Sequence, residues 1–159
     1  MPDPSSNPAS GSRVLIRNFG CKSNWADAAS LQQAFADRGW ARAEVGDGDV
    51  GVCVVNSCTV TEEADRESRR EVRRLRRKYP KAKIVFTGCG AEVDPQAAGA
   101  DHVVGNSSKQ TLVDRVLGPE SGLVSGEIWP LPVKHAVDPM YAGKTRAFLK
   151  VQEGCERFC

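Results

Sequence analysis

Three cysteines of this 159-residue chain each follow a run of apolar, mostly β-branched residues. Cys21 lies in FGCKSN, Cys58 in VVNSCTV and Cys89 in IVFTGCGAE. Each run is typical of a buried strand, so each thiol is expected at the end of a strand, where a helix begins. Cysteines often are merely small buried side chains. Three of them at matching positions favour a set of ligands for a small metal centre.

The other cysteines carry weaker signals. Cys53 lies inside the segment GVCVVNS, which predicts packing in the core. Cys155 and Cys159 have the spacing C-x3-C, which thiolates use to hold iron–sulfur clusters or zinc. Two cysteines make an incomplete site, and a third one further along would give a three-thiolate loop with one open iron.

Strand-like and helix-like segments alternate along the chain. This alternation predicts an α/β fold with an open, mostly parallel, doubly wound sheet and flanking helices. Strands are expected at 13–20, 51–57, 83–88 and 101–106, with a weaker one at 41–45. Helices are expected after Ser23 or Asn24, after Thr61, around Pro95 to Ala98, and after Ser107 or Ser108.

This fold would bring the three strand-end cysteines to one edge. Parallel strands have their carboxyl ends at the same edge, which is where open α/β sheets bind ligands. Neighbouring strands lie ~4.8 Å apart, so thiols on three neighbouring strands would converge within roughly 10 Å. The cysteine pattern therefore predicts a metal centre at this edge of the sheet.

The segments divide the chain into four parts. Residues 1–12 are polar and rich in Pro, Ser and Gly, as in a disordered tail, and 13–118 form the α/β domain. Residues 119–145 are expected to be a linker. Residues 146–159 form a strand that runs into a cysteine loop, as at the start of a second domain that the chain end interrupts.

Composition restricts the class of protein. With 22 basic and 20 acidic residues, the net charge of +2 indicates no partner. No apolar run approaches the ~20 residues of a membrane span, and no secretory signal precedes the first strand. We therefore expect no membrane partner and a cytoplasmic location. There, six cysteines favour metal, cluster or redox chemistry over disulfides.

The motifs together resemble a known family. FGCKSN, VVNSCTVTEEADRESRR, IVFTGCGAE and VVGNSSK are similar to the amino-terminal domain of the methylthiotransferases. These are radical S-adenosylmethionine (radical-SAM) enzymes that add methylthio groups to tRNA or to a ribosomal protein. RAFLKVQEGCERFC resembles the start of their radical-SAM barrel, so the resemblance covers about residues 13–159.

The resemblance implies two [4Fe–4S] clusters and S-adenosyl-L-methionine in the full-length enzyme. Cys21, Cys58 and Cys89 would bind an auxiliary cluster involved in sulfur insertion. Cys155 and Cys159 would be two of the three ligands of the radical-generating cluster, whose open iron binds S-adenosylmethionine. The third ligand, the rest of the barrel and the usual RNA-binding domain are absent from these 159 residues. This chain alone is therefore expected to be inactive, with no catalytic residue assigned and with unknown sulfur and electron donors.

The motifs also rank the substrates. GCKSN and NSCTVTEEADRESRR most resemble the branch that modifies N6-threonylcarbamoyladenosine beside the tRNA anticodon. Isopentenyladenosine tRNA ranks second. A ribosomal protein ranks third, because Lys22 stands where that branch typically has a proline. The alternative from a different functional class is a non-catalytic metal- or RNA-binding module that holds structural zinc. Such a module would not need the additional cysteine loop EGCERFC.

The helix after Cys58 is acidic at its start and basic at its end. This pattern is typical of a solvated helix that is laced with ion pairs and matched to its own dipole. Alternatively, Arg73, Arg76 and Arg77 contact tRNA phosphates. His102 and His135 are remote from the cysteine motifs and are expected in ordinary packing or surface roles.

Overall fold

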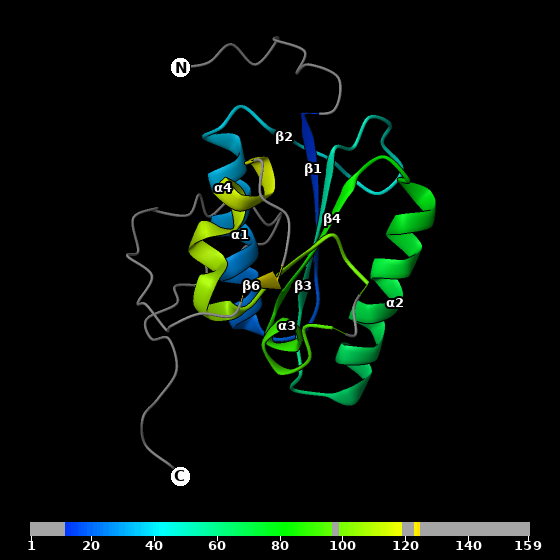
Figure 1. Ribbon diagram of the computed structural model, residues 1–159, viewed down its shortest axis with the longest axis vertical. Coiled ribbons are helices and arrows are strands. Elements are labelled where there is room, and N and C mark those ends of the chain that lie inside the picture. Colours follow the sequence, from blue (N-terminus) through cyan, green and yellow to red (C-terminus); the bar gives the residue numbers. More distant parts are fainter. Residues whose placement is uncertain (1–11, 97–98, 119–122, 125–159) are drawn as a thin grey trace.

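The computed structural model describes residues 12–96, 99–118 and 123–124 (Figure 1). All strands are parallel and form one sheet with the order β2-β1-β3-β4-β5-β6. The strands are β1 (Arg13–Asn18), β2 (Ala41–Arg42), β3 (Val52–Ser57), β4 (Lys83–Gly88), β5 (His102–Val104) and β6 (Leu123–Val124). The predicted open parallel α/β fold is confirmed.

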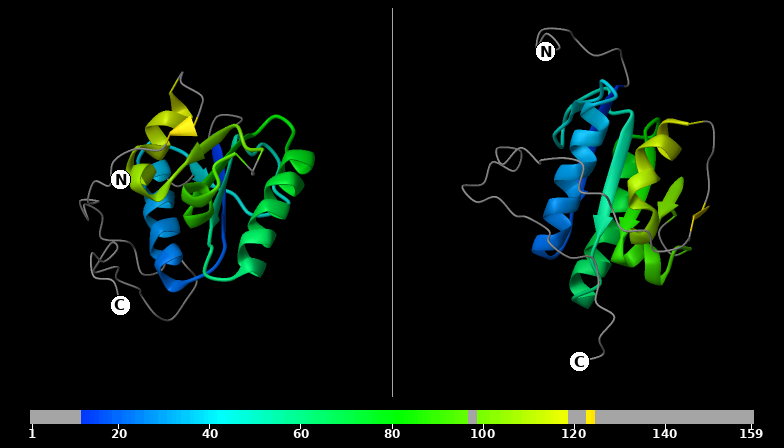
Figure 2. Two further views of the ribbon diagram at one scale, coloured as in Figure 1. Left: turned by 60° about the horizontal axis from the view of Figure 1, so that its bottom comes forward. Right: turned by 90° about the vertical axis from the view of Figure 1, so that its left-hand side faces the viewer.

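Helices cover both faces of the sheet. They are α1 (Lys22–Ala36), α2 (Glu62–Lys78), α3 (Cys89–Val93), the 3-10 turn η1 (Asn106–Thr111) and α4 (Leu112–Leu117). Figures 1 and 2 show α1 and α4 on one face and α2 on the other. The sheet is therefore doubly wound, as its sequence pattern predicts.

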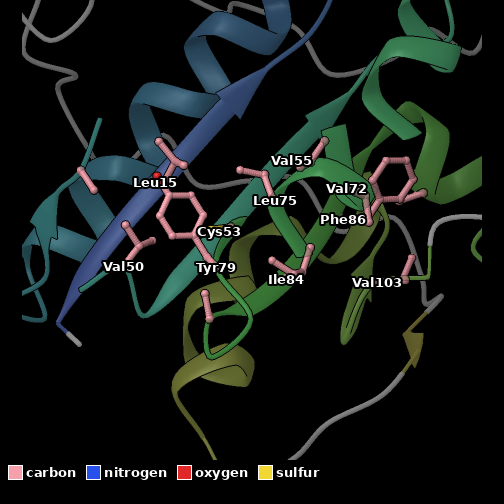
Figure 3. Packing of buried hydrophobic residues seen from close by; sticks show 13 residues of the cluster. Leu15, Val50, Cys53, Val55, Val72, Leu75, Tyr79, Ile84, Phe86 and Val103 are labelled. Carbon is pink, nitrogen blue, oxygen red and sulfur yellow. The ribbon is translucent and has the colours of Figure 1, made fainter. Parts of the chain in front are cut away.

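Each face has its own apolar cluster. On the α2 face, Val72, Leu75 and Tyr79 pack with Cys53 and Ile84 of the sheet (Figure 3). On the other face, α1 and α4 pack against the alternate side chains of the same strands. Every residue of β3 is buried because this strand is central and covered on both sides.

Local signals set most element boundaries. Thr61 caps α2 as predicted, since its Oγ1 accepts a hydrogen bond from the Ala64 N–H at 3.2 Å. The predicted start of α1 is wrong, because Cys21 is its N-cap residue and Asn24 is 3% exposed within its first turn. The closing helix begins as η1 with Gly105 at the N-cap position, earlier than the predicted start near Ser107 or Ser108.

Two further segments differ from expectation. The short helix around Pro95 is instead α3, which begins at Cys89, directly after β4. Gly88 has a φ of +96°, which turns the chain into this helix immediately. Leu123–Val124 forms an edge strand inside the segment that the sequence predicted to be a linker.

The order of the strands indicates where this sheet would bind a ligand. The direction in which successive strands are added reverses between β1 and β3, which are hydrogen-bonded neighbours. Open α/β sheets bind ligands beyond the carboxyl ends of the strands at such a reversal.

Among the described residues, no helix is both long and apolar enough to cross a membrane.

Candidate metal centre

The three predicted cysteines follow three neighbouring strands. Cys21 comes shortly after β1, Cys58 directly after β3 and Cys89 directly after β4, and these strands are adjacent in the sheet. All three are free thiols in the structure. The expectation that they lie at one edge of a parallel sheet is therefore met. Cys155 and Cys159 lie outside the described residues.

The thiols differ in exposure and share a type of neighbour. Cys21 is exposed, Cys89 is intermediate and Cys58 is completely buried. The backbone N–H of Val60 donates to the Cys58 sulfur at 3.5 Å, and the Asn106 side chain Nδ2 donates to the Cys89 sulfur at 3.4 Å. N–H donors directed at a ligand sulfur are typical of the hydrogen bonds that orient the ligands of a metal site.

Two glycines let the cysteine loops pack closely. A Cβ at Gly20 would lie 2.1 Å from the Cβ and 2.3 Å from the Sγ of Cys58. A Cβ at Gly88 would lie 2.3 Å from the backbone oxygen of Ser57. Both glycines have positive φ, +94° and +96°. The loop that carries Cys21 and the turn that carries Cys89 can therefore both lie against the end of β3.

The structure does not confirm convergence of the thiols on a single ion. Among the described residues, no three His, Cys, Asp or Glu side chains lie close enough to hold one. In a [4Fe–4S] cluster, however, each cysteine binds a different iron, so the thiolates surround the cluster rather than meet at one point. Three soft donors at one edge, two of them with N–H donors, suit the ligand chemistry of such a cluster.

Cys53 is excluded from this donor set. It lies within β3, is completely buried and packs with the cluster under α2. Burial, assisted by the negative charge of Glu71 and opposed by Arg76, raises the pKa of the Cys53 thiol to about 12. The thiol therefore stays protonated at neutral pH, as expected for a core residue.

Buried amides and hydroxyls connect the cysteine segments, and sequence reasoning missed them. The Asn24 side chain donates to the backbone oxygens of Phe19 and Ser57, each at 2.8 Å. The Ser57 hydroxyl donates to the Thr87 oxygen at 2.6 Å and accepts from the Gly90 N–H at 2.9 Å. The polar ends of otherwise apolar strands, NS in VVNSC and TG in VFTGC, were the available signal.

Exposed apolar side chains flank the same edge. The large hydrophobic residues that stay exposed in the described part of the chain are Trp25 (38%), Val60 (74%) and Val93 (74%). Each lies within four residues of one of the three cysteines. Apolar side chains gathered around a polar site are typical of a surface that another domain or a ligand covers.

His102 is a packing residue, as the sequence predicted. It lies in β5 and is 4% exposed. Burial, together with the positive charge of Lys83, lowers the pKa of the imidazole, while the negative charge of Asp101 acts in the opposite direction. It is therefore neutral in the folded chain at neutral pH. His135 lies outside the described residues.

Comparison with known sequences places the chain. A family model described as "Uncharacterized protein family UPF0004" matches residues 13–106, a range that contains Cys21, Cys58 and Cys89. The chain belongs to this family. The matched range begins at β1 and ends at the first residue of η1, so it covers the whole cysteine edge.

Several proteins similar to this chain carry methylthiotransferase names. A "Threonylcarbamoyladenosine tRNA methylthiotransferase MtaB" of Aquifex aeolicus is 36% identical over 92% of this chain and 38% of its own length. The protein of the same name in Bacillus subtilis is 33% identical over 92% of this chain and 34% of its own length. A "tRNA-2-methylthio-N(6)-dimethylallyladenosine synthase" of Novosphingobium aromaticivorans is 33% identical over 98% and 37%.

These names confirm the predicted resemblance to methylthiotransferases, with the threonylcarbamoyladenosine branch ahead of the dimethylallyladenosine (isopentenyladenosine) branch. The chain spans little more than a third of the length of these curated relatives.

Proposed function

We propose that this chain is the amino-terminal iron–sulfur domain of a tRNA methylthiotransferase that acts on N6-threonylcarbamoyladenosine next to the anticodon. The observation that carries the proposal is the set of three free cysteines at the ends of three adjacent parallel strands. Relatives with the corresponding name support it. Because the chain spans little more than a third of those relatives, it is proposed to be inactive by itself.

In this proposal, Cys21, Cys58 and Cys89 hold the auxiliary [4Fe–4S] cluster. With three protein ligands, the bound cluster supplies one iron that is open for sulfur delivery. Cys58 is the buried anchor of the set and Cys21 its exposed member. Cys21 is also the N-cap residue of the 15-residue helix α1, whose positive end favours the negative charge of a bound cluster.

The remaining cofactors and partners follow from the same reaction. Cys155 and Cys159 are proposed as two ligands of the second [4Fe–4S] cluster, at which S-adenosyl-L-methionine binds. The partner is tRNA, in the cytoplasm, and the sulfur and electron donors are unidentified. The exposed Trp25, Val60 and Val93 would be covered when the two cluster sites of the full-length enzyme face each other across the substrate.

The arginines proposed to contact tRNA differ in their pairing within the domain. Arg76 pairs with Asp101 at 2.7 Å. Arg73 and Arg77 are exposed and make no ion pair or hydrogen bond within the described residues, and the same holds for Arg66 and Arg70. At positions i, i+4, i+7 and i+11 of α2, these four arginines form one stripe on the helix surface.

The arginine stripe is therefore the preferred tRNA-backbone surface of the domain. Its guanidinium groups are not neutralised by neighbouring carboxylates, so they are free to pair with phosphates. The acidic first turn of α2, with Glu62, Glu63 and Asp65, lies at the end of the helix nearest Cys58. Phosphate contacts are consequently expected along the last three turns rather than at the cysteine edge.

Nucleoside analysis tests the proposed function. The gene that encodes this chain is deleted from its host, and digested tRNA is analysed by liquid chromatography and mass spectrometry. The methylthio derivative of N6-threonylcarbamoyladenosine is expected to disappear while its unmethylthiolated precursor accumulates. Loss of the methylthio-isopentenyladenosine derivative instead would assign the chain to the second branch, and no change in either nucleoside would refute the proposal.

A further inference from the structure

The η1 turn makes side-chain contacts with all three cysteine-bearing segments. Asn106, its first residue, donates from Nδ2 to the Cys89 sulfur at 3.4 Å. Lys109 donates from Nζ to the Asn56 Oδ1 at 3.1 Å, and Asn56 lies two residues before Cys58. The same ammonium group pairs with Asp27 at 2.8 Å, and Asp27 lies in α1, the helix that Cys21 caps.

Lys109 is an unusual lysine because it is inside the protein. Its side chain is 4% exposed and that of its partner Asp27 is 6% exposed. Removing both charges from water costs several kcal/mol per ion, and the pair is retained only with good geometry and further hydrogen bonds. A buried pair of this kind gives little net stability. Its presence is better explained by the segments that it holds in place, which are η1, α1 and the end of β3.

Asn56 carries the effect of Lys109 to the loop of Cys21. With its Oδ1 occupied by Lys109, the amide directs its Nδ2 to the Asn18 Oδ1 at 2.8 Å and to the backbone oxygen of Asn24 at 3.0 Å. Asn24 in turn holds the backbone of Phe19 and Ser57. The network therefore runs from η1 through β3 to both sides of the first cysteine.

Asn106 acts on sulfur directly. Its Oδ1 is buried without a hydrogen-bond partner among the described residues, so the orientation of the amide depends on the contact of Nδ2 with the Cys89 sulfur. Hydrogen bonds to ligand sulfur atoms are one of the means by which proteins set the reduction potential of an iron–sulfur cluster. An N–H donor stabilises the more negative, reduced state and so raises that potential.

We infer that the η1 turn positions the cluster ligands: Lys109 fixes the loops of Cys21 and Cys58, and Asn106 tunes the sulfur of Cys89. Both are positioning residues, since neither binds iron itself. This inference rests on the proposed function, because it requires that the three cysteines hold a cluster. Removing such supporting hydrogen bonds typically lowers metal affinity on the order of 10- to 100-fold.

The test of Asn106 uses the 159-residue chain with Cys155 and Cys159 replaced by Ser, reconstituted anaerobically with iron and sulfide. Asn106→Leu, which keeps the approximate shape without a donor, is expected to shift the cluster potential to more negative values in a redox titration followed by electron paramagnetic resonance. Gln110→Ala, an exposed neighbour in the same turn, is the control and should match the parent. An unchanged potential in Asn106→Leu would overturn the role of Asn106.

The test of Lys109 separates positioning from charge burial. Lys109→Met removes the positive charge that pairs with buried Asp27 and is expected to destabilise the fold, whereas Asp27→Asn with Lys109→Met removes both charges. The double variant is expected to recover the urea midpoint of the parent. It should still bind iron on the order of tenfold more weakly, because the Asn56 side chain lacks its hydrogen bond from Lys109. Recovery of both stability and iron affinity would overturn the role of Lys109. If the parent chain itself binds no cluster, the proposed function fails instead.

Discussion

A methyl group at Gly20 is expected to disrupt the cysteine edge. Gly20 has a φ of +94°, and an added Cβ would lie 2.1 Å from the Cβ and 2.3 Å from the Sγ of Cys58. An L-residue in the left-handed region costs about 1–2 kcal/mol, and overpacking a buried site costs about 1–3 kcal/mol more. Cys58 is completely buried, so it has no open space to move into. Gly20→Ala should therefore lower the free energy of unfolding by about 2–5 kcal/mol.

Gly39→Ala isolates the backbone part of this cost. Gly39 also has a positive φ, +78°, but an added Cβ there meets no described atom within 4 Å. It should cost about 1–2 kcal/mol. Urea unfolding of the two variants of the 159-residue chain under reducing conditions, followed by circular dichroism, measures the difference. Equal destabilisation by the two substitutions would show that the loop of Cys21 does not pack on Cys58, and the reasoning on the site would fail.

Three other predictions test separate parts of the structure. Cys53, whose thiol pKa is raised to about 12, should resist iodoacetamide in the native chain, whereas the exposed Cys21 should react. Peptide mass spectrometry measures the labelling of each cysteine, and rapid labelling of both would place Cys53 outside the core. Because the pKa of His102 is lowered in the folded state, unfolding takes up a proton in mildly acidic solution, and stability is lost as the pH falls below the ordinary histidine value of 6.5. His102→Gln should reduce this loss between about pH 7.5 and about pH 5.5 in urea titrations, and an unchanged pH dependence would contradict the assignment. In the full-length protein, replacing Arg73 and Arg77 by Gln should reduce the slope of tRNA affinity against salt by roughly two, one for each lost phosphate contact, and an unchanged slope would leave the stripe as a solvated surface.

The sequence was sufficient where one local pattern determines the outcome. Continuous apolar runs predicted β1, β3 and β4, because strands buried on both faces have no polar alternation. The cysteine edge followed, since parallel strands end at the same side and each of these three strands is followed by a cysteine. Thr61 was predicted as a cap because a threonine hydroxyl just before a helix can accept a hydrogen bond from the first turn, which is a local interaction.

The sequence was insufficient where contacts between distant segments decide. Asn24 has the propensity of a helix cap, but its side chain instead bonds to Ser57, which is 33 positions away. Lys109 has the pattern of a surface lysine, and only the fold shows that Asp27, 82 positions away, pairs with it in the interior. Arg76 was grouped with Arg73 and Arg77 by composition, whereas its pairing with Asp101 depends on where β5 lies.

Iron and sulfide analysis of the reconstituted chain shows whether the three strand-end cysteines hold a cluster. The 159-residue chain with Cys155 and Cys159 replaced by Ser is reconstituted anaerobically and desalted, and Mössbauer spectroscopy identifies the bound iron. About four irons and four sulfides per chain are expected, as a [4Fe–4S] cluster. Replacing Cys21, Cys58 or Cys89 singly by Ser should reduce this sharply, because Ser is a poor ligand for soft metals, and Cys53→Ser should preserve it in the folded fraction. Full iron in Cys58→Ser together with loss of iron in Cys53→Ser would show that Cys58 is not a cluster ligand and that Cys53 is.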